Sequence, residues 1–131
     1  MKLKKITDSI KFGTNILDIE VPEHLKKKFS SGLNYVDGAM GGEGFTPSAV
    51  TLFTGTPGAG KTTLMLAMAD SMTKQGAIVL FNTAEESLYQ TAMTAKRLNL
   101  KNGFRCGNSA DVNEIIKNAS KMQKEAKKAG K

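Results

Sequence analysis

The stretch that most constrains this chain is "GTPGAGKT" at residues 55–62, directly after the apolar run "AVTLFT". Its spacing fits the pattern G-x-x-x-x-G-K-[ST], whose fixed positions are Gly55, Gly60, Lys61 and Thr62. Glycines let the backbone curl tightly and approach an anion closely, because they tolerate left-handed dihedral angles. A glycine-rich turn of chance composition would not need a lysine and a threonine at the mouth of a helix. The stretch therefore predicts a loop that holds a phosphate-bearing ligand.

The residue types in this loop indicate a nucleoside triphosphate bound with Mg²⁺. Backbone N–H groups can surround the phosphates, and the following helix points the positive end of its dipole at them. We expect Lys61 to lie near the β and γ phosphates, Thr62 to coordinate Mg²⁺ and Thr63 to lie near the α phosphate. Lys61 is also a candidate catalytic residue, since its charge would lie at the reacting phosphate. The residues expected to bind the nucleotide are Gly55, Thr56, Pro57, Gly58, Ala59, Gly60, Lys61, Thr62 and Thr63.

Short apolar runs alternate with amphipathic stretches on both sides of the loop. The apolar runs predict buried strands at 49–54, 77–81 and, more weakly, 103–106. The amphipathic stretches predict helices at 61–74, 86–98 and about 111–128. This order predicts an α/β fold in which a mostly parallel sheet, with right-handed crossovers, carries helices on both faces.

Three local signals refine these elements. Gly76 stands where the helix after the loop should stop. Asp111 followed by Glu114 resembles a capping box at the start of the last helix. On that helix an apolar stripe is expected, made of Val112, Ile115, Ile116, Ala119 and Met122.

The two ends of the chain are basic. Residues 1–30 carry a net charge of +3, residues 31–90 carry −3 and residues 91–131 carry +7. We expect 1–30 to form an N-terminal basic arm and 31–131 to form the nucleotide-binding domain, which begins with a glycine-rich loop containing one helical turn around Leu33–Val36. Basic ends suit a polyanion such as DNA, and a solubilising surface is an equally good explanation.

Lysines recur along the last helix at three- and four-residue steps, at Lys117, Lys121, Lys124 and Lys128. Such a stripe is typical of the solvated outer face of an amphipathic helix. A DNA-contact surface is the alternative, although no aromatic residue is interleaved for stacking on bases.

The sequence predicts neither a membrane protein nor a secreted protein. No apolar run approaches the roughly 20 residues that a membrane span needs. The basic N-terminus is not followed by the apolar stretch of a signal peptide. The single cysteine, Cys106, cannot form an internal disulfide, so a reducing cytoplasm is the expected location.

Two carboxylates, Glu85 and Glu86, follow the predicted strand 77–81. Ligands of an open parallel sheet lie beyond the carboxyl ends of its strands. A carboxylate there could orient a water molecule for attack on the γ phosphate. The simpler alternative is that two acids favour the dipole of the helix that follows.

The stretches "SGLNYVDGAMGGEGFTPSAVTLFTGTPGAGKTTLMLAMA" and "NTAEESLYQTAMTAKRLNL" together resemble the RecA-like ATPase core of the RadA/Sms DNA-repair proteins, relatives of KaiC and of the DnaB replicative helicases. The resemblance covers about residues 31–100. It implies an ATPase of DNA recombination or repair that is stimulated by single-stranded or branched DNA and assembles as a homo-oligomeric ring. It also implies that Glu85 is the catalytic base, with Glu86 as its neighbour or substitute.

The sequence departs from the RadA pattern in two respects. Residues 1–30 contain no cysteine, so the usual four-cysteine zinc finger is missing, and no strand ending in aspartate follows Ile116. We therefore expect the N-terminal part of a longer protein, which alone hydrolyses ATP poorly. A DnaB-like helicase core and a KaiC-like signalling ATPase, or another non-motor nucleotide-binding module, remain alternatives.

Overall fold

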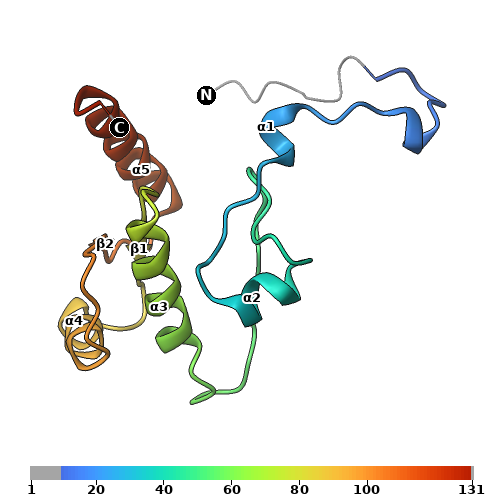
Figure 1. Ribbon diagram of the computed structural model, residues 1–131. Coiled ribbons are helices and arrows are strands. Elements are labelled where there is room, and N and C mark those ends of the chain that lie inside the picture. The colour runs from blue at the N-terminus through green and yellow to red at the C-terminus, as the bar shows by residue number, and fades with distance from the viewer. Residues whose placement is uncertain (1–9, 131) are drawn as a thin grey trace.

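The computed structural model describes residues 10–130, so the first nine residues of the predicted arm and Lys131 lie outside the described part. Figure 1 shows the order of the elements along the chain. They are η1 (Ile16–Asp18), α1 (Glu23–Lys26), α2 (Asn34–Ala39), α3 (Lys61–Lys74), β1 (Leu80–Asn82), α4 (Leu88–Arg97), β2 (Arg105–Gly107) and α5 (Val112–Lys128). None of these helices is both long and apolar enough to cross a bilayer.

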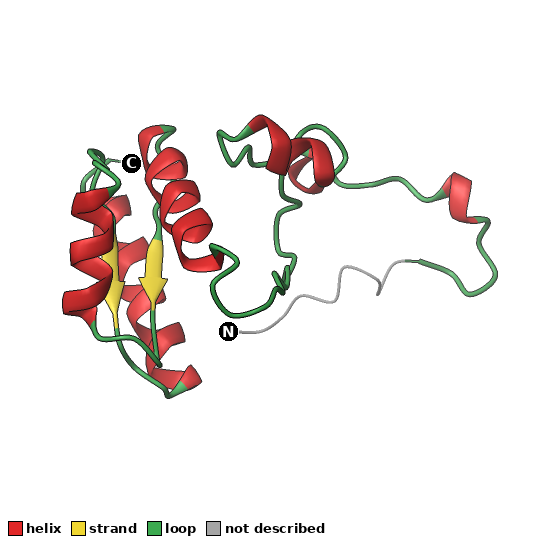
Figure 2. Cartoon of the chain, turned by 90° about the horizontal axis from the view of Figure 1, so that it is seen from below, coloured by secondary structure: helices red, strands yellow, loops and turns green. Residues whose placement is uncertain are grey.

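The sheet consists of β1 and β2, which pair in parallel with Leu80 opposite Arg105. The N–H group of Thr83 donates to the carbonyl oxygen of Gly107 at 3.0 Å and extends the ladder past the end of β1. Helix α4 forms the crossover between the strands, and helices lie on both sides of the pair (Figure 2). The predicted α/β class and parallel pairing are confirmed.

The predicted strand at 49–54 is wrong. The segment has no regular secondary structure, and the Val50 and Leu52 side chains are 100% and 84% exposed. A strand needs a partner for its backbone groups, and within residues 10–130 the only partner of β1 is β2. Composition predicted burial, but burial requires a neighbour that this segment does not have in the described part of the chain.

The other two strands are shorter than predicted and shifted toward the C-terminus because glycines with left-handed dihedrals precede them. Gly76 has φ +96° and caps α3, and the N–H group of Ala77 still donates to the Met72 carbonyl at 3.0 Å. This cap takes up the first part of the predicted strand 77–81. Gly103 has φ +63°, which no strand residue adopts, so β2 begins only at Arg105.

Helix α3 has the bounds that the sequence predicts, and it carries most of the core. Leu66 is completely buried, and Met68 and Ala69 are each 6% exposed. Val36 of α2 is the remaining buried apolar residue of the described chain. The core is therefore aliphatic with methionine as filler, as a chain without tryptophan predicts.

Helix α4 begins with a complete capping box. The Ser87 hydroxyl accepts from the N–H group of Gln90 at 3.2 Å, and the Gln90 side chain accepts from the N–H group of Ser87 at 3.4 Å. The capping box predicted for α5 is wrong. Asp111 caps the N–H group of Asn113, but its own N–H group donates to the Ser109 hydroxyl, which in turn donates to Glu114 at 2.8 Å. Ser109 thus takes both partners that the box would have joined.

The apolar stripe predicted on α5 is only partly covered. Of its five residues, Ile115 and Met122 are half-buried, whereas Ala119 is exposed and Val112 and Ile116 are 66% and 56% exposed. An exposed ion pair of 2.7 Å joins Arg105 of β2 to Glu125 of α5.

Candidate nucleotide-binding site

The loop from Gly55 to Gly60 turns sharply into α3. Gly58 and Gly60 have φ angles of +79° and +88°, and Gly60 is the N-cap of the helix. The N–H group of Ala59 donates to the Thr56 carbonyl at 3.1 Å inside the loop. The first helical bond runs from Leu64 to Gly60 at 2.9 Å. The N–H groups of residues 61–63 precede that bond and belong to the free amino end of the helix, where an anion is stabilised.

Lys61 closes the loop on its first residue. Its ammonium nitrogen donates to the carbonyl oxygen of Gly55 at 2.6 Å. A Cβ atom at Gly55 would lie 3.4 Å from the Ala59 Cβ and 3.5 Å from the Lys61 Cδ, so the chain passes close to itself here. This bond keeps the lysine charge at the phosphate loop, in the turn that precedes α3 (Figure 1).

A cavity of about 680 Å³ brings the loop together with the predicted carboxylates. Lys61 and Thr62 line it together with Glu85 and Glu86, which follow the carboxyl end of β1. Both glutamates are exposed, and neither lies in the first turn of α4. The stabilising effect of a helix dipole falls off within one turn, which weakens the alternative explanation of these two acids.

Thr83 shapes the turn that carries the glutamates. Its hydroxyl accepts from the N–H group of Glu86 at 3.2 Å and lies 3.3 Å from the Glu86 carbonyl oxygen, to which it donates. Its own N–H group is held by Gly107 in the ladder. The turn around Glu85 is therefore attached to the sheet, a link that the sequence signal "TAEE" did not reveal.

A second cavity, of about 510 Å³, lies against the same loop. We call it the tyrosine cavity; Tyr35, Phe53, Thr54, Ala59, Gly60, Lys61, Thr63, Leu64 and Ala67 line it. Thr63 therefore opens onto a different space from Thr62.

Residues 30–37, which precede the phosphate loop in the chain, contain a buried carboxylate that sequence reasoning missed. Asp37 of α2 accepts from the Ser30 hydroxyl, from the N–H group of Ser31 at 2.8 Å and from the Ser31 hydroxyl at 2.7 Å. The bond from Ser30, followed by those from Ser31, lowers the pKa of Asp37 below its usual range. The turn also packs on α3, since the Gln75 amide donates to the Ser30 carbonyl at 3.3 Å.

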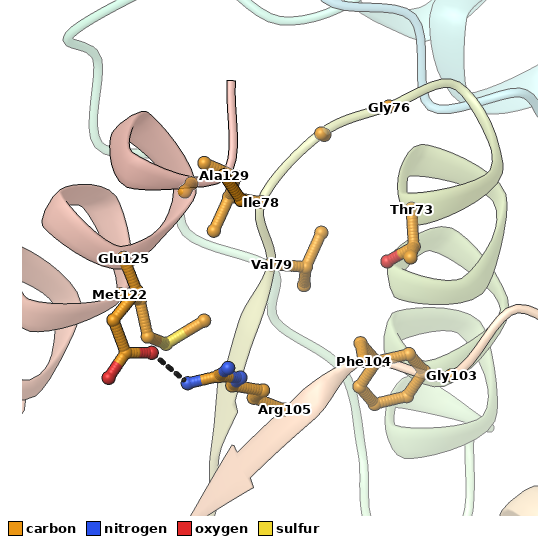
Figure 3. Close-up of a pocket in the computed structure, with 12 residues that line it drawn as sticks. Thr73, Gly76, Ile78, Val79, Gly103, Phe104, Arg105, Met122, Glu125 and Ala129 are labelled. Atoms are coloured by element: carbon orange, nitrogen blue, oxygen red, sulfur yellow. Dashed lines mark hydrogen bonds and ion pairs between the residues drawn. The ribbon is translucent and has the colours of Figure 1, made fainter. Parts of the chain in front are cut away.

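A third cavity, of about 570 Å³, lies away from the loop (Figure 3). It is bounded by Ile78, Val79, Phe104 and the Arg105–Glu125 pair, at the amino ends of the strands. Ligands of parallel sheets bind at the opposite, carboxyl ends. The third cavity is therefore not part of the candidate site.

The oxygen donors around Thr62 fit Mg²⁺ but not a metal held by protein ligands alone. Within residues 10–130 no group of three or more His, Cys, Asp or Glu side chains is placed to hold a metal ion. Mg²⁺ usually takes one or two protein oxygens and completes its shell with water and phosphate. The Thr62 hydroxyl, at the edge of the cavity that Glu85 lines, satisfies that requirement.

Comparison with known proteins agrees with this geometry. The family described as CobW/HypB/UreG, nucleotide-binding domain, matches residues 49–129, more than half of the chain. No solved structure is significantly similar to the chain.

Similar curated proteins include DNA repair proteins named RadA. That of Haemophilus influenzae is 45% identical over 73 residues, which are 56% of this chain and 16% of the relative. That of Helicobacter pylori is 38% identical over 96 residues, or 73% and 21%. That of Aquifex aeolicus is 39% identical over 87 residues, or 66% and 19%. The chain thus spans about a fifth of these relatives' length, and the predicted resemblance to RadA in the phosphate-loop core is confirmed.

Proposed function

This chain belongs to the CobW/HypB/UreG nucleotide-binding domain family, and we propose that it is the ATP-binding core of a RadA-type, DNA-processing ATPase with a RecA-like fold. The observation that carries the proposal is the cavity that Lys61 and Thr62, at the amino end of α3, line together with Glu85. ATP hydrolysis needs groups that bind the phosphates and a residue that positions the attacking water, and a carboxylate can fill the second role.

In this proposal each group has a distinct role. The backbone of residues 55–60 and the free N–H groups of α3 bind the β and γ phosphates. Lys61 exchanges its bond to Gly55 for phosphate oxygens, and Thr62 donates an oxygen to Mg²⁺, which neutralises phosphate charge when bound. Thr63 lies toward the α phosphate. Glu85 accepts a proton from the attacking water, and Thr83 positions the turn that carries it.

The proposed domain comprises residues 31–131, preceded by the basic arm 1–30, and its proposed second ligand is single-stranded or branched DNA. The names of the RadA relatives support DNA, and so does the charge of +7 on residues 91–131. The lysines that recur along α5 are exposed, and no ion pair of the described chain involves them: Lys117, Lys121, Lys124 and Lys128. A homo-oligomeric ring, as the resemblance implies, is part of the same proposal.

ATP binding is tested by titrating the chain with ATP and Mg²⁺ in a calorimeter. Lys61→Ala should weaken binding roughly 10- to 100-fold, because it removes a charged hydrogen-bond donor. Lys74→Ala, at the opposite end of the same helix, is the matched control and should bind as the wild type does. Equal affinity of the two variants would overturn the assignment of the phosphate loop.

DNA binding is tested by measuring the affinity for a labelled single-stranded oligonucleotide over a range of salt concentrations. Binding through several phosphates should weaken steeply as salt rises. A weak, salt-independent response, with ATP binding intact, would favour a non-motor nucleotide-binding module over RadA-like and DnaB-like functions.

A further inference from the structure

Two adjacent threonines at the start of α3 open onto different cavities. Thr62 lines the cavity that holds Glu85 and Glu86, whereas Thr63 lines the tyrosine cavity. Successive helical side chains point about 100° apart, which explains the divergence. The first turn of α3 therefore borders two chemically different cavities, and Lys61 lines both of them.

The tyrosine cavity has the chemistry of a site for an uncharged aromatic ring. Its walls are apolar at Phe53, Leu64 and Ala67, and Lys61 is its only charged residue. The hydroxyl groups of Thr54 and Thr63 add two polar positions. Its volume of about 510 Å³ lies within the 300–1,000 Å³ that small-ligand sites occupy. The other cavity, with two carboxylates, suits phosphate and metal instead.

Tyr35 is available in this cavity as a stacking surface. Its side chain is 70% exposed, and neither aromatic pair of the described chain, Phe45–Phe53 or Phe81–Phe104, includes it. The backbone beneath it is fixed, because the next two residues, Val36 and Asp37, are buried. An exposed ring on a fixed backbone binds a flat partner without loss of core packing.

We propose that the tyrosine cavity receives the base and ribose of the nucleotide and that Tyr35 stacks on the base. This inference rests on the proposed function, since the phosphates must lie on the loop beside Lys61. It orients the ligand with its base toward α2 and its terminal phosphate toward Glu85. A purine, which has the larger stacking face, is favoured over a pyrimidine.

The test compares the binding of ATP with that of inorganic triphosphate, which lacks a base. Tyr35→Ala should weaken ATP binding about 10-fold and leave triphosphate binding unchanged, because only the stacking contact is lost. Tyr35→Phe keeps the ring and should bind ATP as the wild type does. Tyr89→Ala is the matched control, since Tyr89 is 85% exposed on α4 and lines neither cavity.

Fluorescence gives a second readout. The chain has two tyrosines and no tryptophan, so in Tyr89→Phe the emission comes from Tyr35 alone. ATP should quench that emission and triphosphate should not. Tyr35→Phe, which retains only Tyr89, is the control: any loss of its emission on adding ATP measures how much excitation light the base itself absorbs.

Each possible result decides the question. Equal weakening of ATP and triphosphate by Tyr35→Ala would mean a distorted loop and would overturn the stacking role. If the wild type binds ATP and Tyr35→Ala binds it with the same affinity, the stacking role is also overturned. Failure of the proposed function looks different, because the wild type would then bind neither ligand, and the stacking inference would fall with it.

Discussion

Asp37 holds Ser31 by two hydrogen bonds, one from its backbone N–H group at 2.8 Å and one from its hydroxyl at 2.7 Å. Ser31 is completely buried, and Asp37 is 9% exposed. The Ser30 hydroxyl donates to the same carboxylate. A single acidic side chain thus organises the turn that leads into α2, on which Tyr35 stands.

The first prediction concerns pH. The pKa of Asp37 is lowered in the folded chain, so its contribution to stability is fully present above the unfolded value of 3.8. That contribution is lost as pH falls from 3.8 through the folded pKa. We expect Asp37→Asn to lower the melting temperature at pH 7 and to reduce the loss of stability below pH 3.8.

Thermal unfolding followed by circular dichroism between pH 2 and 7 measures this effect. Asp18→Asn is the control, because Asp18 is exposed and its side chain accepts no hydrogen bond in the described chain. If Asp37→Asn and Asp18→Asn shift the melting temperature equally at pH 7, the hydrogen bonds to Asp37 do not stabilise the fold.

The second prediction concerns the contact between the turn at residues 30–32 and α3. Gly32 has φ +77°, and a Cβ atom there would lie 1.6 Å from the Ser71 Oγ and 2.9 Å from the Ser71 Cβ. Gly32→Ala should lower the free energy of unfolding by about 2–4 kcal/mol, through the left-handed backbone and the collision. Urea unfolding measures the change.

Gly38→Ala is the matched control for this contact. Gly38 lies inside α2, and nothing lies within 4 Å of its added Cβ. Alanine is the better helix former, so this variant should be neutral or gain about 0.5–1 kcal/mol. A Gly32→Ala variant as stable as Gly38→Ala would show that the turn does not pack on α3 in solution.

Local signals predicted some elements of the fold to the residue. Helix α3 lies between Gly60 and Gly76, whose left-handed dihedrals start and stop it, and both glycines are visible in the sequence. The phosphate loop is likewise a contiguous motif. Features of this kind depend on neighbouring residues alone, and sequence patterns report them well.

Features that depend on distant partners were missed. The apolar run at 49–54 predicts a buried strand, but burial depends on which strands lie beside it. Tyr35 and Asp37 stood in a stretch that its glycines marked as loop. The place of Tyr35 emerges only in the folded chain, where it lines one cavity with Leu64 and Ala67 of α3. Asp37 bonds to serines only six or seven residues away, but no short motif reports these bonds.

The third prediction concerns Asp70 of α3 and Asn102, which precedes β2. The backbone N–H group and the side-chain amide of Asn102 each donate to the Asp70 carboxylate at 2.9 Å. A double-mutant cycle of Asp70→Ala and Asn102→Ala should give a coupling energy of about 0.5–1.5 kcal/mol. Strictly additive effects in urea unfolding would contradict the pairing.

The last prediction concerns catalysis and separates the two carboxylates of the 680 Å³ cavity. Glu85→Gln keeps the shape of the side chain but removes its ability to accept a proton. We expect ATP affinity to stay within about twofold of wild type, while turnover falls about 100-fold or more, as the loss of a general base predicts. Single-turnover assays with enzyme in excess measure the hydrolysis step even where it is slow.

Glu86→Gln is the matched control, because Glu86 lines the same cavity and is also exposed, but its N–H group is the one that Thr83 holds. It should retain most of the turnover. Thr83→Val should lower turnover while leaving ATP affinity unchanged, since it frees the turn without removing a carboxylate. If Glu86→Gln loses turnover and Glu85→Gln does not, the base is Glu86. Full activity in both glutamine variants would place the base outside this turn.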